Sequence, residues 1–234
     1  MHSVKSGGLA VVIGHSGGIG KALFDALNQS GAFAEVIGYS RTSDPGIDLL
    51  DEQSIIDAAK AVEIRHTDLR LVFDATGFLH GNGFTPEKTL KTLTPEHMAH
   101  AFAVNAIGPA LLMKHFLPLL AKDGKSVFAT LSAKVGSIGD NALGGWYSYR
   151  ASKAALNQFV HTAAIELSRK SPDAICVALH PGTVDTGLSA GFAKNGLTVR
   201  NPADTAALLL TVLDQFTAAE TGGFYDYSGN PLPW

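Results

Sequence analysis

Short apolar runs alternate with longer stretches of helical periodicity along this chain, and that alternation restricts the fold more than any other feature. The first run, Leu9–Ile13, is uninterrupted and stops at Gly14, as expected for a strand that is buried on both faces. Apolar residues then recur at helical spacing until Gly31 ends the pattern. Strands that alternate with helices in this way indicate a parallel sheet covered by helices on both faces.

The same pattern continues to the C-terminus. Further strands are expected at residues 36–39, 46–49, 69–75, 126–131, 174–179 and 223–227. Further helices are expected at about 52–62, 94–121, 148–170 and 201–216, with Thr94 as an N-cap before Pro95 and with Asn201-Pro202 at the start of the last helix. We therefore expect an α/β fold of the Rossmann type, a doubly wound parallel sheet of about seven strands in the order 3-2-1-4-5-6-7.

Composition excludes several other classes of protein. Apolar residues make up 46% of the chain and charged residues 17%, so a large core is available and intrinsic disorder is excluded. The formal net charge of −3 provides no basic surface for nucleic acid or for an anionic membrane, and neither partner is expected. No charge-free stretch reaches the roughly 18 residues that span a bilayer. The single cysteine, Cys176, leaves no internal disulfide and fits a reducing compartment, so a cytoplasmic location is expected.

Three glycines join the first expected strand to the first expected helix. Gly14, Gly18 and Gly20 have the spacing G-x-x-x-G-x-G. A glycine turn between a strand and a helix N-terminus lets backbone amides approach a pyrophosphate. Because no repeat or linker divides the chain, we expect a single dinucleotide-binding Rossmann domain over residues 1–234, with a small substrate loop around 187–200.

Other interpretations of these glycines remain open. They could serve only a tight turn. Residues 14–18 also match G-x-S-x-G, the nucleophile elbow of α/β-hydrolases, with Ser16 as the nucleophile. In those enzymes the elbow normally follows several strands, whereas here it follows the first, which disfavours a hydrolase. The position of the motif at a strand-to-helix turn still agrees with an elbow, so this alternative stays open. A P-loop is disfavoured because His15 stands at a required glycine and Ala22 has no hydroxyl for magnesium.

A tyrosine and a lysine, Tyr149 and Lys153, lie four residues apart at the start of the long expected helix, which places both side chains on one face. An ammonium near a phenol favours the phenolate and is expected to lower the pKa of Tyr149 toward neutrality. Tyr149 could then give a proton to a carbonyl or take one from an alcohol. The same spacing also occurs by chance, with the tyrosine in the core and the lysine in solvent.

Together these residues resemble the short-chain dehydrogenase/reductase superfamily over essentially the whole chain. The shared motifs are the glycine cluster, the Tyr149/Lys153 pair, Val104-Asn105, the strand-end serine Ser132, and Pro-Gly-Thr-Val-Asp-Thr at 181–186. Residues 139–153 and the Pro-Leu-Pro-Trp ending are similar to the C-factor-like (C-signal-type) branch of that superfamily.

The resemblance implies a catalytic tetrad. Tyr149 is then the general acid/base, and Lys153 lowers its pKa and holds the nicotinamide ribose. Ser132 donates a hydrogen bond to the substrate oxygen, and Asn105 holds a water that relays protons to Lys153. Pro109 supports this last role from the residues alone, because it has no N–H for the Asn105 carbonyl and a local helix kink would free that carbonyl for water. A helix that is broken for packing alone is the alternative.

Three departures from the family pattern affect this assignment. The serine pair of the family is Ser132-Ala133 here, although the second member is the one that is usually catalytic. Ser132 also lies 17 residues before Tyr149, a longer spacing than typical members have. Ser137 is therefore kept as the second candidate. The family's Asn-Asn-Ala-Gly is Asp-Ala-Thr-Gly at 74–77, so we expect its structural role to be altered.

The residues after the second expected strand distinguish the two nicotinamide cofactors. NAD-selecting proteins place an acid there, which accepts from the ribose 2′-OH. This chain has Ser40 and Arg41, which suit a 2′-phosphate, so NADP(H) is expected in preference to NAD(H). An ordinary loop arginine is the alternative. By resemblance the other cofactor contacts are Gly14, Ser16, Gly18, Ile19, Gly20, Asp48, Leu49, Ala75, Gly77, Tyr149, Lys153, Pro181, Gly182, Val184 and Thr186.

The remaining candidates carry weaker signals. His97 and His100 have a helical ligand spacing, but no other ligands complete a site, so both are interpreted as solvated and no metal is expected. His180 is interpreted as the end of a strand rather than as a base. Trp146 and Tyr147 are candidates for contact with substrate, with core packing as the alternative. Candidates for an apolar pocket wall are Leu79, Phe84 and Phe192.

Two functions of different classes follow. The first is an NADP(H)-dependent oxidoreductase that passes hydride between the nicotinamide and a small-molecule carbonyl or secondary alcohol. The second is a nucleotide-binding signalling or regulatory protein with little turnover. The intact Tyr149/Lys153 pair favours the enzyme. By resemblance, a homodimer or homotetramer that pairs its two longest helices across two-fold axes is expected.

Overall fold

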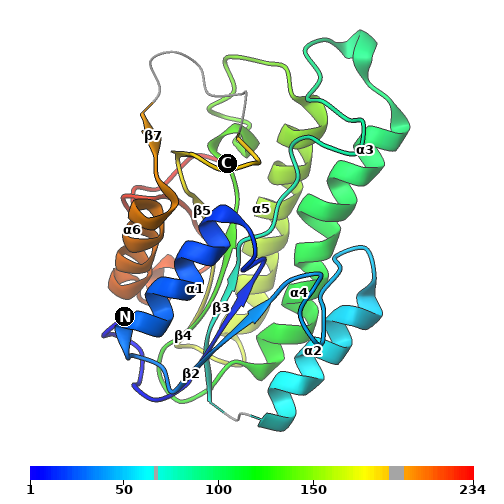
Figure 1. The fold of residues 1–234 in the computed structure, drawn as a ribbon. Coiled ribbons are helices and arrows are strands. Elements are labelled where there is room, and N and C mark those ends of the chain that lie inside the picture. The colour runs from blue at the N-terminus through cyan, green and yellow to red at the C-terminus, as the bar shows by residue number, and fades with distance from the viewer. Residues whose placement is uncertain (66–67, 190–197) are drawn as a thin grey trace.

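Parallel strands form the main sheet (Figure 1). The computed structural model describes residues 1–65, 68–189 and 198–234. Neighbouring strands pair in parallel in the order β2-β1-β3-β4-β5-β8, so all their carboxyl ends lie along one edge, as predicted. The strands are β1 (Leu9–Ile13), β2 (Glu35–Tyr39), β3 (Leu69–Asp74), β4 (Ser126–Leu131), β5 (Ala174–His180) and β8 (Phe224–Asp226). The predicted doubly wound α/β fold is confirmed.

Helices cover both faces of this sheet (Figure 1). On one face lie α1 (Gly18–Ser30) and α6 (Pro202–Gln215), and their buried residues form one core cluster with the strands. On the other face lie α2 (Glu52–Arg65), α4 (Gly108–Phe116) and α5 (Tyr147–Ser168), which form a second cluster. α3 (Pro95–Phe102) leads into α4 and packs against α5.

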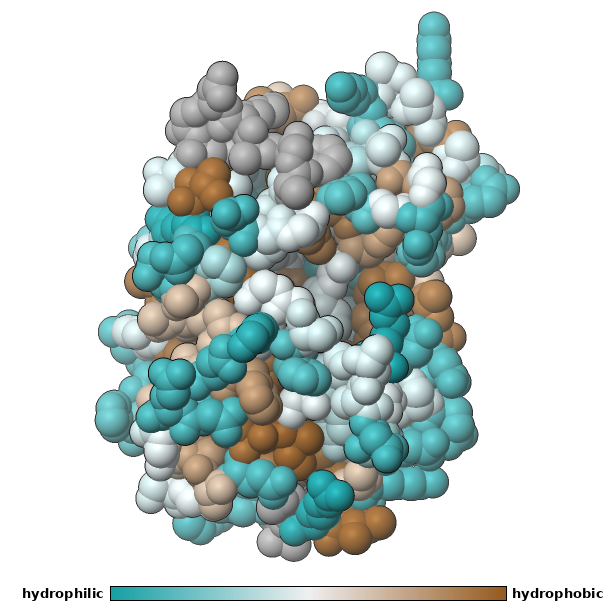
Figure 2. Space-filling view, in the orientation of Figure 1, coloured by the Kyte–Doolittle hydropathy of each residue, from teal (hydrophilic) through white to brown (hydrophobic). Residues whose placement is uncertain are grey.

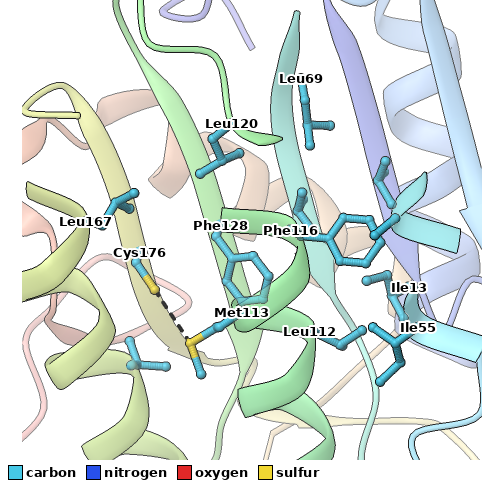
Figure 3. Packing of buried hydrophobic residues seen from close by; sticks show 14 of the residues in the cluster. Ile13, Ile55, Leu69, Leu112, Met113, Phe116, Leu120, Phe128, Leu167 and Cys176 are labelled. Carbon is cyan, nitrogen blue, oxygen red and sulfur yellow. Dashed lines mark hydrogen bonds between the residues drawn. The ribbon is translucent and has the colours of Figure 1, made fainter. Parts of the chain in front are cut away.

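The second cluster is fully closed to solvent around α4. Figure 3 shows Met113 of α4 beside Phe128 of β4 and directed at β5, where the Cys176 Sγ lies 3.9 Å from the Met113 Sδ. Burial raises the pKa of Cys176 to about 12. The thiol is therefore a packing group at neutral pH and not a nucleophile.

Residues 46–49 were expected to form an outer strand, and that prediction is wrong. The backbone groups of this segment are taken by local hydrogen bonds: Ile47 N donates to Ser40 O at 2.9 Å, and Asp48 N donates to Ser54 Oγ at 2.9 Å. The Ile47 side chain is buried in the core, which explains the apolar signal. The sheet therefore has six strands and ends at β2.

The segment expected as one helix over 94–121 is divided at its centre. Thr94 caps α3, as predicted, by accepting from His97 N at 3.3 Å. Residues Ala103–Ile107 then form a π-helical turn before α4 begins. Because Pro109 has no N–H, the usual bond to the Asn105 carbonyl cannot form. The predicted distortion at Asn105 is confirmed.

Among the described residues, one helical segment, Pro95–Leu119, is long and apolar enough to cross a membrane by length and composition. Core helices satisfy the same criterion. In this fold α4 packs against α2 and α5, and Leu112 and Phe116 are fully buried.

A second, two-stranded sheet pairs β6 (Thr183–Val184) with β7 (Val199–Arg200). The Arg200 guanidinium lies 3.7 Å from the centre of the Tyr227 ring, which supports this sheet. The predicted substrate loop around 187–200 is described only at 187–189 and 198–200, and Phe192 lies outside the described residues.

Candidate active site

A cavity of about 620 Å³ lies at the carboxyl edge of the sheet, between the start of α1, the end of β2 and the start of α5. Ligands of open α/β sheets bind at this edge. Pale residues of intermediate hydropathy cover the centre of the face seen in Figure 2, in keeping with a lining rich in glycine, serine and threonine. The predicted cofactor residues that line this cavity are Gly14, Ser16, Gly18, Ile19, Ser40, Arg41, Asp48, Leu49, Ala75, Gly77, Tyr149, Lys153, Pro181 and Thr186.

Three predicted cofactor residues do not line that cavity. Gly20 is buried in the first turn of α1, where a side chain would overlap the Gly14 carbonyl. Its role is therefore to let the helix pack closely against the glycine turn. Gly182 and Val184 line a neighbouring cavity. Gly182 has φ +80°, a conformation that favours glycine.

The glycine turn presents the start of α1 to the cavity. Gly14 has φ +82°, and a Cβ on it would lie 3.2 Å from the Ala75 carbonyl group. The N-cap residue Gly17 makes no side-chain cap, and the first turn of α1 carries no acidic residue. The helix therefore offers uncapped N–H groups and the positive end of its dipole to an anion, as a pyrophosphate requires.

The end of β2 supplies the cationic part of the cavity. Ser40 is buried, and its hydroxyl lies 3.1 Å from the Thr42 hydroxyl within a tight turn. Arg41 is exposed, and no described residue forms an ion pair or a hydrogen bond with its guanidinium. The Asp48 carboxylate accepts from Leu50 N at 3.0 Å. An anionic group in this part of the cavity can therefore be paired with Arg41.

Lys153 is buried, and its Nζ donates to Leu131 O at 2.9 Å. Burial lowers the pKa of Lys153 to about 8, and the nearby Asp74 carboxylate opposes part of that shift. Lys153 is therefore mostly protonated at neutral pH, although its pKa lies much closer to neutrality than that of an exposed lysine.

Tyr149 is buried and also lines this cavity. Its ring packs with Leu79 and Ala133, and it meets the Trp146 ring edge to face at 6.2 Å between ring centres. Burial raises the pKa of Tyr149, so the expectation that Lys153 lowers it is wrong for this state of the protein. The apolar surroundings disfavour the phenolate, and Tyr149 carries its proton at neutral pH.

Asn105 is buried below the cavity and holds the loop after β3. Its Oδ1 accepts from Phe78 N at 2.7 Å, and its Nδ2 donates to Phe78 O at 2.8 Å and to Ser152 Oγ at 3.1 Å. Both side-chain atoms of Asn105 are therefore engaged. Because Pro109 has no N–H to bond it, the Asn105 backbone carbonyl in the π-helical turn remains the candidate for the predicted water relay.

The two candidate serines occupy different surroundings. Ser132 lines both cavities, and its hydroxyl donates to Asn157 Oδ1 at 2.6 Å. Ser137 is buried away from both described linings, where its Oγ accepts from Asp140 N at 3.0 Å. Ala133 is the residue that packs against Tyr149. The geometry places Ser132, and not Ser137, within reach of a ligand beside Tyr149.

A second cavity, of about 490 Å³, meets the first at Tyr149, Ser132 and Thr186. Apolar residues form most of its wall. Burial lowers the pKa of His180, which also lines the cavity, to about 4, so this histidine is neutral. His180 ends β5, as predicted. Of the predicted substrate contacts, the described lining includes Leu79 and Trp146 but not Phe84 or Tyr147.

The interpretation of His97 as a solvated residue is wrong, whereas His100 is half-buried and lines the first cavity. His97 is buried, with its Nδ1 3.1 Å from Glu87 Oε1, and His100 packs edge to face on Phe78 with 4.5 Å between ring centres. The helical periodicity concealed this because the partner, Glu87, comes from an irregular loop. No group of three or more potential ligands suited to a metal ion occurs in the described part of the chain.

Sequence reasoning noted Asp74 only as a departure from the family pattern. The carboxylate is fully buried and accepts from Thr76 N at 3.0 Å and from Thr130 Oγ1 at 2.7 Å. Burial raises its pKa, while these hydrogen bonds and Lys153 oppose the shift. Asp74 therefore fixes the turn from β3 to Gly77 and adds negative charge near Lys153.

Comparison with known proteins agrees with this geometry. A family model described as enoyl-(acyl carrier protein) reductase matches residues 32–209. The chain is 30% identical over 202 residues to 1-hydroxy-2-glutathionyl-2-methyl-3-butene dehydrogenase of Rhodococcus sp. (strain AD45), covering 86% of this chain and 84% of that protein. It belongs to the short-chain dehydrogenase/reductase superfamily and is an oxidoreductase of that type.

The chain is also similar to C-signal and to a solved carbonyl reductase structure. The chain is 35% identical over 137 residues to C-signal of Myxococcus xanthus, covering 58% of this chain and 78% of that protein. An NADPH-bound carbonyl reductase from chicken fatty liver has the same fold, with a TM-score of 0.84, 24% sequence identity, and coverage of 99% of this chain and 100% of the other. The predicted likeness to C-signal is thus confirmed.

Proposed function

We propose that this protein is an NADP(H)-dependent oxidoreductase that interconverts a small-molecule carbonyl and the corresponding alcohol, with Tyr149 as general acid/base. One observation carries the proposal: a cavity suited to a dinucleotide and a smaller apolar cavity meet at Tyr149 and Ser132. A hydroxyl at that junction would be within reach of a carbonyl substrate held in the second cavity beside a dinucleotide in the first.

The residues of the first cavity fit NADP(H). The uncapped start of α1 suits the pyrophosphate, and Arg41, which has no ion-pair partner among the described residues, suits a 2′-phosphate. Bound there, NADP(H) supplies or takes up the hydride. The chicken carbonyl reductase, described as NADPH-bound, supports the same choice of cofactor.

Tyr149 handles the proton. Because burial raises its pKa, Tyr149 is protonated at neutral pH and can donate to the oxygen of a carbonyl as that oxygen gains charge. Lys153, with a pKa of about 8, places a positive charge one helical turn away, which stabilises the phenolate left behind. The backbone carbonyl of Asn105 would hold the water that returns a proton.

Ser132 is the second donor to the substrate oxygen in this proposal. In the structure its proton is held by Asn157 Oδ1, while the Asn157 Nδ2 has no hydrogen-bond partner among the described residues. A half-turn of this amide exchanges the two atoms, so that Nδ2 donates to Ser132 Oγ. The Ser132 proton is then free for the substrate.

The second cavity favours an uncharged, largely apolar substrate. Its apolar wall includes Leu79, Val135 and Trp146. The guanidinium of Arg150, which also lines it, is used by the carbonyls of Gly145, Val135 and Gly144 at 2.9–3.2 Å. Three of its five N–H groups are thus engaged by backbone carbonyls, and His180 is neutral.

Two measurements test this proposal. We expect NADPH to bind at least tenfold more tightly than NADH, and Arg41→Ala to remove that difference. We expect NADPH oxidation with members of a panel of aliphatic and aromatic ketones and aldehydes. Equal or tighter binding of NADH would contradict the cofactor preference, and no turnover of any carbonyl would contradict the activity.

A signalling or regulatory protein with little turnover is the second candidate, and the likeness to C-signal favours it. It shares the cofactor site but predicts that the wild-type protein binds NADPH and leaves every carbonyl unreacted. The hydrolase alternative has no comparable support, because none of the described hydrogen bonds joins Ser16 to a histidine or a carboxylate; it predicts ester cleavage that Ser16→Ala abolishes.

We also propose that two copies pair through α4 and α5. Among the described residues of α5, α4 and the turn before α4, three large apolar side chains are exposed: Ile107 immediately before α4, and Phe159 and Ile165 on α5. Burial of such side chains against a second copy would stabilise a two-fold dimer.

A further inference from the structure

A buried acid that the proposed mechanism does not use lies at the start of the helix that carries Tyr149. Glu87 comes from the irregular loop between β3 and α3, and only 3% of its surface is exposed. Its Oε2 accepts from Ser148 N at 3.2 Å, and its Oε1 accepts from the Ser148 hydroxyl. A carboxyl group from a distant loop thus caps the first turn of α5, one residue before Tyr149.

The backbone of the same residue holds the entry to α5. Trp146 N donates to Glu87 O at 2.5 Å. Trp146 has φ +54°, which is uncommon for a residue with a large side chain, and it follows Gly144 and Gly145, whose φ values are also positive. A left-handed non-glycine residue persists only where its surroundings fix it. Glu87 provides that constraint immediately before the helix begins.

Glu87 is itself fixed from behind by α3. His97 Nδ1 lies 3.1 Å from Glu87 Oε1, and the His97 ring stacks on the Phe84 ring with 4.8 Å between the ring centres. Both members of the pair are buried. A buried acid held by a helix cap, a hydroxyl and an imidazole has little freedom to move.

The loop that carries Glu87 also forms part of the candidate active site. Asn105 binds both backbone groups of Phe78, and the next residue, Leu79, packs against Tyr149. The loop therefore contacts Tyr149 at one end through Leu79 and fixes the helix turn of Tyr149 at the other end through Glu87. The position of Tyr149 relative to the cofactor cavity depends on both contacts.

We propose that Glu87 is a positioning residue for Tyr149, which it acts on through Ser148 and Trp146, with His97 holding it in place. This inference rests on the proposed function, because it concerns the general acid of that reaction. Loss of Glu87 allows the first turn of α5 to shift, and a misplacement of about 1 Å can lower a reaction rate by about a hundredfold.

Steady-state kinetics of Glu87→Gln test this role, with Glu96→Gln, an exposed acid at the start of α3, as the matched control. We expect kcat for carbonyl reduction to fall by about ten- to a hundredfold in Glu87→Gln while the Kd for NADPH stays within about twofold. The isotope effect with NADPH deuterated at the transferred hydrogen should rise, because hydride transfer becomes rate-limiting. Ser148→Ala, which removes a single hydrogen bond, should show a smaller fall in kcat and a smaller rise in the isotope effect. This variant replaces Glu87→Gln in the test if Glu87→Gln does not fold.

A fluorescence measurement tests the same contact without any substrate. In a Trp234→Phe background Trp146 is the remaining tryptophan, and we expect its quenching by acrylamide to rise about twofold in Glu87→Gln but not in Glu96→Gln. Unchanged quenching, or an unchanged kcat in a Glu87→Gln protein with a lower melting temperature, would overturn the positioning role. If the wild-type protein turns over no carbonyl, the proposed function fails, whereas the quenching result still decides whether Glu87 fixes this turn.

Discussion

At the scale of single residues, burial decides the protonation states of the candidate active site. Burial raises the pKa of Tyr149 and lowers that of Lys153, so each group is driven toward its neutral form. The Tyr-x-x-x-Lys spacing correctly indicated a shared location, and both residues line the first cavity. The spacing could not indicate how much water would be excluded, and for that reason the expected lowering of the tyrosine pKa was wrong.

The lowered pKa of Lys153 predicts a pH-dependent cost in stability. In the unfolded chain its pKa is near 10.5, so burying the charged form costs up to about 3 kcal/mol below pH 8. The cost declines as the pH rises from 8 to 10.5 and is absent above that range. Lys153→Met should therefore be stabilised relative to the wild-type protein at pH 7, and that advantage should shrink by pH 10. Thermal unfolding of both cofactor-free proteins at the two pH values measures this; a difference that does not vary with pH would contradict the buried charge.

Ser132 and Asn157 should act as one unit. We expect Ser132→Ala to lower kcat/KM by about a hundredfold, as loss of a donor to a developing oxyanion does in other enzymes. Asn157→Leu should cause a smaller loss, of about tenfold, because the serine is kept but its proton is no longer oriented. The double variant should be no worse than Ser132→Ala alone, since Asn157 acts through Ser132. Losses that add in the double variant would argue against this coupling.

At the scale of elements, the junctions between regular segments form the site. The turn from β1 to α1 was predictable from three glycines, because only a close backbone approach requires them at that spacing. The break before α4 was predictable from Pro109. The Glu87 loop was not, because its contact with α5 joins residues about sixty positions apart and leaves no periodic pattern.

Replacement of Pro109 tests the function of that break. Pro109→Ala restores an N–H that can bond the Asn105 carbonyl, and alanine suits a helix interior better than proline by about 3 kcal/mol. We expect the melting temperature to be unchanged or higher and kcat to fall by about tenfold, because the carbonyl is withdrawn from the water relay. A variant with unchanged kcat would show that the break serves packing alone.

At the scale of the whole molecule, one fold brings two cavities together at one edge of the sheet. The parallel order of the strands was predictable from their alternation with helices, since right-handed crossovers leave few other arrangements. The absent outer strand was not predictable, because the burial of Ile47 mimics a strand pattern. The apolar character of the second cavity was also hidden, because its wall combines Leu79, Val135 and Trp146 from three separate segments.

The exposed apolar side chains on α5 give a prediction for the assembly. We expect the wild-type protein to be a dimer or tetramer by light scattering and Phe159→Glu to weaken that association, because the introduced charge would have to be buried at the interface. Gln29→Glu on α1 makes the same change in charge on the other layer and should have no effect. A wild-type monomer, or an unaffected Phe159→Glu oligomer, would place the interface elsewhere or exclude it.

The central claim is that Tyr149 gives and takes the proton in carbonyl reduction, and Tyr149→Phe tests it most directly because phenylalanine keeps the ring that packs on Leu79 and Ala133. We predict that kcat with NADPH and the best carbonyl of the panel falls by about a hundred- to ten-thousandfold, while the Kd for NADPH and the melting temperature change little. A Tyr149→Phe protein that reduces the same carbonyl within a few-fold of the wild-type rate would contradict the account.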